Sequence, residues 1–328
     1  MSAVSEAVTN SAMRTREATV RRFALTDTIF RTATRLSAIL VLVLLGGVAI
    51  SLITGSWQAL SKFGFSFLTT ESWNPVTENF GALAPIYGTI VTSAIAILIA
   101  VPIGIGIAVF LTELCPRPLR RPIGIAVELL AGIPSIIYGI WGLFVFAPFL
   151  QTTVQPFIIK IFHGIPGLSS LFAGPPYGIG MLTSSLILAI MVLPFITSIT
   201  KDVFDTVPSV LKESAYGIGC TTWEVTRRVV IPYTRVGIMG GVMLGLGRAL
   251  GETMAVTFVI GNAHRISASL FAPGTTISAT IANEFTEADG DLYTSSLVAL
   301  GLILFIITFI ILAIARYMLL RIDSRTGA

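Results

Sequence analysis

The stretch GIMGGVMLGLGRALGETMAVTFVI, from Gly237 to Ile260, decides the fold class. It exceeds the roughly 20 apolar residues that cross a bilayer, and it carries Arg248 and Glu252 near its middle. An arginine at the centre of a bilayer costs about 2.5–3.5 kcal/mol on insertion scales, and a chain accepts that cost where the charge is paired or faces a polar path. The stretch therefore predicts a membrane-spanning helix with two charges one helical turn apart. It also indicates a route for something charged.

The composition of the whole chain agrees with a membrane protein. Hydrophobic residues make up 54% of the chain and charged residues only 12%, whereas soluble domains are about 25% charged. The mean hydropathy is +0.88. The net charge of +4 is modest and forms no basic patch interleaved with aromatic residues, so the chain is not expected to bind nucleic acid.

Six segments approach the roughly 20 apolar residues that a bilayer requires, so an all-α polytopic membrane protein is predicted. The third segment is long enough to be tilted or broken. Residues 34–328 are expected to form the six-span domain, with its core at 85–320. The predicted spans are Leu36–Thr54, Tyr87–Leu111, Ile123–Leu150, Gly178–Ser198, Gly237–Ile260 and Ser296–Ala315.

Basic residues gather in the N-terminal segment, in the loops after the second and fourth predicted spans, and at the C-terminus. The opposite loops hold only Lys62, Lys160 and Arg265. Since loops rich in Lys and Arg stay in the cytoplasm, both termini are predicted to be cytoplasmic. The tail of residues 1–33 can lie amphipathically on the membrane surface through Arg21–Arg31, or it is a loosely ordered basic tail that fixes topology. Both interpretations stay open.

Cysteine and histidine residues point to neither redox nor metal chemistry. Cys115 and Cys220 fall in predicted cytoplasmic loops, where reducing conditions argue against a disulfide. His163 and His264 fall in predicted outer loops without a neighbouring Cys/His cluster, so no metal site is expected.

The predicted cytoplasmic loop 201–235 contains the sequence DVFDTVPSVLKESAYGIGCTTWEVTRRVVIP, from Asp202 to Pro232. We expect two short helices joined by a glycine turn, because proline suits an early helical position, glycine a helix end and threonine an N-cap. The predicted boundary residues are Val207–Ser209, Gly217 and Gly219, Thr221 or Thr222, and Pro232, which is expected to stop the second helix. Such a helical pair makes a docking surface.

This loop resembles the conserved cytoplasmic loop of bacterial ABC importer permeases, which reads Glu-Ala-Ala, three residues, Gly, nine residues, then Ile-x-Leu-Pro. The alternative is an ordinary amphipathic cytoplasmic loop. The resemblance implies that the loop sits in a groove of an ATPase subunit and transmits its motion. The matching residues are Glu213, Ser214, Ala215, Gly219, Val229, Ile231 and Pro232, with Ser214, Val229 and Ile231 as conservative departures.

The chain itself is not expected to hydrolyse ATP. A phosphate-binding loop needs a Gly-Lys-[Ser/Thr] sequence, and none of the lysines, Lys62, Lys160, Lys201 and Lys212, follows a glycine. The energy for transport must come from a partner or from an ion gradient.

Two roles stay open for Arg248. Gly241, Gly245, Arg248 and Glu252 fall on one face of a continuous helix, and small residues let neighbouring helices approach that face. Arg248 could form an i,i+4 pair with Glu252 that holds the bundle together. Alternatively, it could meet a transported anion through its planar guanidinium, with Glu252 restraining it between transport events.

Further candidate path residues flank an expected helix break. Gly132-Ile133-Pro134-Ser135 should bend or break the third span and free backbone N–H groups for an anion. Ser135 and Tyr138 add hydroxyl donors there, and Thr89 lies with Thr92 and Ser93 on one face of the second span. We expect Glu128 to pair with Arg120 or Arg121 near the membrane interface.

The predicted outer loop Gly261–Ser295 carries Glu284, Glu287, Asp289 and Asp291. An acidic loop repels a free anion but suits a protein that delivers the anion by docking. The alternative is a solvated charged loop without a partner.

Three stretches closely resemble the phosphate-specific, PstC-type branch of these permeases: Gly81–Thr89, Glu213–Val225 and Gly247–Val256. The likeness covers nearly the whole chain from the first span onward. It implies the six-span type I ABC importer fold, placement in the bacterial cytoplasmic membrane, and phosphate import by alternating access. It also implicates Arg248 and Glu252 in transport.

The resemblance further implies a heterodimer with a PstA-type sister permease, two PstB-type ATPase subunits and a PstS-type phosphate-binding protein outside. ATP and Mg²⁺ would bind to the ATPase subunits, and this chain would carry no cofactor. Other possibilities remain: a permease for sulfate, molybdate or phosphonate, an ion-coupled secondary anion transporter, or a membrane scaffold without a path of its own.

Overall fold

The computed structural model describes residues 2–162, 164–165 and 167–324. The predicted outer-loop residue His163 and the basic residue Arg325 lie outside these ranges. Within them, six helices are long and apolar enough to cross a membrane, which confirms the predicted number of spans. Their bounds are Thr26–Phe63, Leu83–Leu114, Ser135–Phe162, Met181–Asp205, Thr222–Leu250 and Asp291–Leu319.

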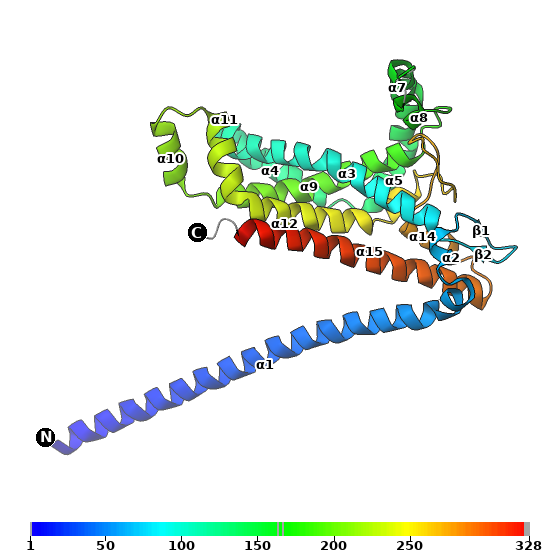
Figure 1. Cartoon of the computed structure of the whole chain (residues 1–328). Helices are drawn as coiled ribbons and strands as arrows, with labels where there is room; N and C mark the ends of the chain where they lie inside the picture. The colour runs from blue at the N-terminus through cyan, green and yellow to red at the C-terminus, as the bar shows by residue number, and fades with distance from the viewer. Residues whose placement is uncertain (1, 163, 166, 325–328) are drawn as a thin grey trace. The chain divides into compact units, whose positions relative to one another are not determined.

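Most of the described chain is helical, and many of the long helices are interrupted (Figure 1). In the described part of the chain, π-helical turns interrupt or extend the helical runs at Phe110–Leu114, Gly142–Phe146, Leu150–Val154 and Thr226–Val230. The α-helices are α1 (Ser2–Phe63), α2 (Ser66–Thr69), α3 (Leu83–Val109), α4 (Arg117–Ala131), α5 (Ser135–Trp141), α6 (Ala147–Phe149), α7 (Gln155–Phe162), α8 (Leu168–Leu171), α9 (Met181–Asp205), α10 (Ser209–Gly217), α11 (Thr222–Val225), α12 (Ile231–Leu250), α13 (Met254–Thr257), α14 (Ile277–Glu284) and α15 (Asp291–Ser324). A two-stranded antiparallel hairpin, β1 (Trp73–Asn74) and β2 (Asn79–Phe80), precedes α3.

The chain divides into two compact units between Thr54 and Gly55. The first unit is the N-terminal part of α1, whose apolar side chains from Leu36 to Ile53 are largely exposed. An apolar helix surface of this size is typical of a segment that contacts lipid or another chain.

The second unit is built around α9, which packs against both α3 and α12, while α15 packs on α12 (Figure 1). Glycines permit the close contact between α9 and α12. A Cβ atom at Gly245 would lie 2.9 Å from side-chain atoms of Val192 and Ile196, and one at Gly241 would lie 3.1 Å from Ile199. The prediction that the glycine face of this span packs inward is therefore confirmed.

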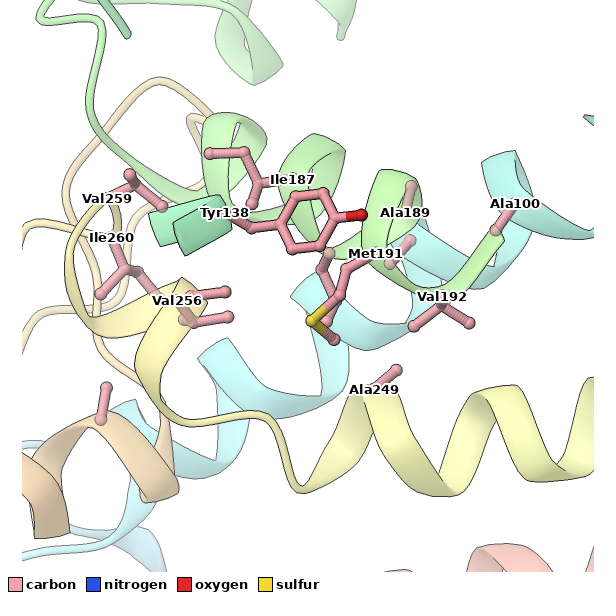
Figure 2. Close-up of a cluster of buried hydrophobic side chains, with 14 of the residues drawn as sticks. Ala100, Tyr138, Ile187, Ala189, Met191, Val192, Ala249, Val256, Val259 and Ile260 are labelled. Atoms are coloured by element: carbon pink, nitrogen blue, oxygen red, sulfur yellow. The ribbon is translucent and has the colours of Figure 1, made fainter. Parts of the chain in front are cut away.

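A core of buried apolar side chains joins α3, α5, α9, the end of α12 and α13. Figure 2 shows Tyr138, Met191 and Val256 converging in this core, with Ala249 of α12 beside them. Since close-packed cores resist movement of their members, this cluster fixes the position of the neighbouring residue Arg248.

The third predicted span is wrong at its start. Residues 117–131 form the separate helix α4, whose Arg-rich, largely exposed surface does not suit a bilayer centre. The chain breaks at Gly132–Pro134 as predicted, and the apolar run then continues from Ser135 to Phe162. The break follows from Pro134, which disfavours helix at the residue before it and directly precedes the first residue of α5.

The prediction of one continuous helix from Gly237 to Ile260 is also wrong. The helix α12 ends at Leu250, residues 251–253 are not helical, and the short helix α13 follows. The sequence around the break contains Gly251 and the β-branched Thr253, both of which favour helix less than alanine.

Candidate transport path and coupling surface

Arg248 lies in the last turn of α12, where the partial negative charge of the helix C-terminus favours a cation. Its guanidinium carbon is 4.3 Å from the centre of the Phe195 ring, and its buried Nε atom has no hydrogen-bond partner among the described residues. No carboxylate of the described residues lies within ion-pair distance of it. A cation–π contact therefore holds a charge that no side chain neutralises.

Glu252 lies beyond the end of α12, and its side chain bonds to the short helix α13 instead. Its Oε1 accepts a hydrogen bond of 3.2 Å from the N–H of Ala255, at the start of α13. The predicted i,i+4 pair with Arg248 is wrong, because that pair requires a helix that continues past Leu250.

The helices that follow the two breaks, α5 and α13, pack against each other. A Cβ atom at Gly139 of α5 would lie 3.0 Å from the carbonyl oxygen of Met254 and 3.1 Å from Cα of Ala255, so α5 and α13 touch backbone to backbone. Tyr138 is buried, and its hydroxyl donates a 3.0 Å hydrogen bond across the break to the carbonyl of Leu130. Interrupted helices that pack together are typical of transporter binding sites.

The predicted path residues do not all gather at this point. Tyr138 joins the core around Ala249. Ser135 begins α5 and is half-buried. Thr89 lies elsewhere: its hydroxyl donates to the Pro85 carbonyl at 2.8 Å and accepts from the Ile277 N–H at 2.9 Å, which fastens the start of α14.

Three buried hydroxyls on α3 and α9 lack a hydrogen-bond partner within the described chain. The Oγ atoms of Ser93 on α3 and of Thr197 and Thr200 on α9 are buried and make no hydrogen bond within the described chain. Sequence reasoning noted Ser93 but missed Thr197 and Thr200, although their three-residue spacing places both on one helix face. Such atoms can donate to a passing polar solute.

The loop between α9 and α12 forms the predicted helical pair. The first helix, α10, ends at Gly217, and Gly219 adopts a φ of +90°, which favours glycine. Thr221 caps α11 in a capping box with Glu224, which confirms the predicted cap. Large apolar side chains remain exposed here, including Val210, Ile218 and Trp223.

Pro232 does not stop the second helix as predicted. The π-helical turn Thr226–Val230 directly precedes it, and the helical run continues from Thr222 to Leu250. A proline needs a gap in the regular ladder of hydrogen bonds, and the change from π to α geometry supplies one. One helical run thus connects the loop that holds α10 and α11 to the turn that carries Arg248.

The residues that match the family loop take distinct positions. Ala215 is buried in a cluster with Val225 and Val230, whereas Ser214 bonds its own helix through the Val210 carbonyl at 2.7 Å. Glu213 is exposed, and Val229 and Ile231 are half-buried against the same cluster. Ala215 therefore buries one face of α10, whereas Glu213 and Ser214 are exposed.

Residues 100–324 match the family model described as "Binding-protein-dependent transport system inner membrane component". The chain belongs to this family. The phosphate transport system permease protein PstC of Mesorhizobium japonicum is 86% identical over 328 residues, which is 100% of both chains. The protein of the same name from Pasteurella multocida is 58% identical over 301 residues, covering 92% of this chain and 94% of that relative.

Solved structures show the same permease fold. A chain of a bacterial alginate ABC transporter, in complex with an alginate-bound periplasmic protein, has a TM-score of 0.56 and 20% identity, covering 87% of this chain and 94% of that chain. A chain of the inward-facing MetNI methionine ABC transporter has a TM-score of 0.53 and 16% identity, covering 73% and 94% respectively. The permease is a multi-pass protein of the inner membrane, with the predicted all-α ABC importer fold.

One ion pair of this permease was missed by sequence reasoning. Lys212 of α10 donates to Glu113 at 2.6 Å, and the Glu113 side chain is only 7% exposed. Glu113 lies in the π-helical turn that extends α3, so the pair ties α10 to that span. Its one sequence signal is a lone glutamate between an apolar span and a basic loop.

Glu128 also pairs differently from the prediction. It contacts Lys201 at 3.3 Å rather than Arg120 or Arg121, and Arg120 instead pairs with Asp205. Both contacts join α4 to α9, and neither partner is close in sequence, which is why local spacing could not identify them.

The acidic loop that is predicted to lie outside divides into two parts. Glu284 is half-buried: it contacts His264 Nε2 at 2.7 Å and accepts hydrogen bonds from Trp73 and from the Tyr293 hydroxyl. Burial raises the pKa of Glu284, but the hydrogen bonds and the charge of His264 outweigh burial and leave that pKa below its usual value. Only Glu287, Asp289 and Asp291 remain exposed for a partner.

Proposed function

We propose that this chain is the permease subunit through which an ATP-driven importer moves inorganic phosphate across the inner membrane. The observation that carries this proposal is Arg248, a half-buried cation near the end of α12 whose Nε atom is buried and which has no carboxylate partner among the described residues. The shared name of the relatives, phosphate transport system permease protein PstC, supports phosphate as the cargo.

Arg248 suits a tetrahedral oxyanion for chemical reasons. The planar guanidinium can donate two parallel hydrogen bonds to two oxygens of one phosphate, and such charge-assisted bonds are about twice as strong as neutral ones. Its Nε–H has no partner, so one donor of this fork is unused. Phosphate would draw Arg248 from the face of Phe195 toward the path.

Glu252 then acts as a structural neighbour rather than as a competitor for Arg248. Because it caps α13, it fixes the break that keeps α12 from continuing past Leu250. Ser135 and Tyr138 would line the same break on the α5 side, whereas Thr89 would act only by positioning α14.

The chain works with other subunits of an ABC importer, and the particular partners belong to this proposal. A PstA-type sister permease would complete the membrane path, two PstB-type ATPases would bind ATP and Mg²⁺, and a PstS-type protein would deliver phosphate. The exposed apolar side chains Val210, Ile218 and Trp223 suit a groove on the ATPase. The exposed acids Glu287, Asp289 and Asp291 suit the delivering protein.

Coupling would follow two physical connections. ATP-driven closure of the ATPases moves α10, and the Lys212–Glu113 pair carries that motion to the end of α3. The continuous helical run from Thr222 to Leu250 carries it to Arg248. Alternating access then opens the break outward to accept phosphate and resets it after hydrolysis.

Uptake into proteoliposomes that hold this chain with its sister permease, ATPase and binding protein tests the proposed cargo. We expect ATP-dependent uptake of radiolabelled phosphate, and little uptake of sulfate or molybdate under the same conditions. Uptake of sulfate, molybdate or a phosphonate in place of phosphate would reject the cargo. Uptake without any ATPase subunit would reject the ATP-driven class.

A further inference from the structure

A cavity of about 360 Å³ lies where α4 meets α9, on the side that the Lys/Arg bias assigns to the cytoplasm. It is separate from the break beside Arg248. Six charged residues line it: Arg117, Arg120, Arg121, Glu128, Lys201 and Asp205. Four of these six are cations, so the cavity has an excess of positive charge.

The two carboxylates of this cavity are already engaged. Asp205 pairs with Arg120, and Glu128 pairs with Lys201 at 3.3 Å. Lys201 also lies 3.7 Å from Asp202. Arg117 and Arg121 make no ion pair within the described chain, so two guanidinium groups border the cavity without a counter-charge.

The form of α4 places this charge at the membrane surface. Its arginines lie in the first five residues, and apolar side chains such as Leu119, Ile125 and Leu129 are largely exposed along it. A helix with separate basic and apolar surfaces lies in the interface, where its arginines meet lipid head groups.

A small residue keeps the cavity open. Gly124 of α4 is buried, and a Cβ atom there would lie 3.7 Å from Cε of Lys201. A larger side chain at this position would therefore extend into the space beside Lys201 and reduce the cavity without changing its charge.

We propose that this cavity binds a phosphate group, carried either by the head group of an anionic phospholipid or by inorganic phosphate. Arginine forks match phosphate oxygens in pairs, and Arg117 and Arg121 have no other anion to satisfy them. Basic pockets between membrane helices on the cytoplasmic side bind anionic head groups. An occupant would bridge α4 to α9 directly before the coupling helix α10.

The test compares full-length wild type with Arg117→Gln/Arg121→Gln in detergent. Native mass spectrometry measures retained phosphatidylglycerol against phosphatidylcholine, and equilibrium dialysis measures radiolabelled inorganic phosphate. We expect the preference of the double variant for phosphatidylglycerol over phosphatidylcholine to be about tenfold lower than that of wild type. Gly124→Leu, which fills the cavity and keeps every charge, should lose the same preference. If instead only inorganic phosphate binds to wild type and is lost in both variants, the group comes from the free ion.

The matched control is Arg35→Gln/Arg316→Gln, which removes two exposed basic residues outside the cavity. It should bind both ligands like wild type. An equal loss in the control would show general charge attraction and overturn the site. Equal binding of both ligands by wild type and the Arg117/Arg121 variant would overturn it as well.

Discussion

At the scale of single residues, the structure separates charges that the sequence places together. Arg248 and Glu252 are four positions apart, yet Arg248 faces Phe195 and Glu252 caps α13. The sequence was sufficient to identify both residues, because charges in apolar stretches are conspicuous. Their partners depend on where the helix stops and on Phe195 of α9, which no local pattern reveals.

The Glu284 cluster predicts a pH dependence of stability. The pKa of Glu284 in the folded chain lies below its usual value of 4.5. A carboxyl with a lowered folded pKa stabilises the fold above its unfolded pKa and loses that contribution as pH falls through its folded pKa. We therefore expect the outer region to lose stability as pH falls below 4.5.

Thermal unfolding in detergent between about pH 6 and about pH 3 measures this effect. Wild type should lose more stability over this interval than Glu284→Gln, which has no carboxyl at that position. Glu287→Gln, at an exposed acid of the same loop, is the control and should behave like wild type. Parallel pH profiles for wild type and Glu284→Gln would contradict the argument.

At the scale of elements, the sequence predicted helices and turns well and their interruptions less well. Gly219 and the Thr221 cap were found because their signals are local. The prediction that Pro232 ends a helix is wrong because the π-helical turn before it accommodates the proline within one helical run. Such a turn has no clear sequence signal. The basic helix α4 was merged into a span because its apolar residues continue those of α5.

The contact between α9 and α12 predicts a specific cost for a larger residue at Gly245. A Cβ atom there would press on Val192 and Ile196 at 2.9 Å. We expect Gly245→Val to destabilise the fold by about 1–3 kcal/mol, because overpacking shifts both helices. Gly240→Ala is the matched control, since nothing lies within 4 Å of a Cβ at that position.

Thermal unfolding of the two variants decides this point. The control should equal or exceed the stability of wild type, because alanine favours helix more than glycine does. If Gly245→Val were as stable as the control, α9 and α12 would not pack as closely as the structure has them.

At the scale of the whole molecule, the coupling loop, the end of α3 and the Arg248 turn form one connected system. Lys212–Glu113 joins the loop to α3, and the helical run Thr222–Leu250 joins it to Arg248. The sequence predicted the loop and its resemblance but not the connection, because Lys212 and Glu113 are far apart in the chain.

Glu113→Gln should uncouple ATP hydrolysis from transport. The neutral amide weakens a pair whose carboxylate is only 7% exposed, and we expect phosphate uptake per ATP to fall about fivefold or more. ATPase activity and uptake are measured together in proteoliposomes of the assembled importer. Glu78→Gln, in the exposed pair with Lys62, is the control and should leave the ratio unchanged. An unchanged ratio in Glu113→Gln would remove this pair from the coupling route.

The most direct test of the central claim is phosphate uptake by Arg248→Gln in the same proteoliposomes, with subunit assembly and ATPase activity scored alongside. Gln keeps hydrogen-bonding capacity but removes the charge that no carboxylate balances. The account predicts that uptake falls about a hundredfold or more while assembly persists, as expected when a charge-assisted contact worth about 3 kcal/mol is lost. Full uptake by the assembled variant would contradict it and make Arg248 a structural residue.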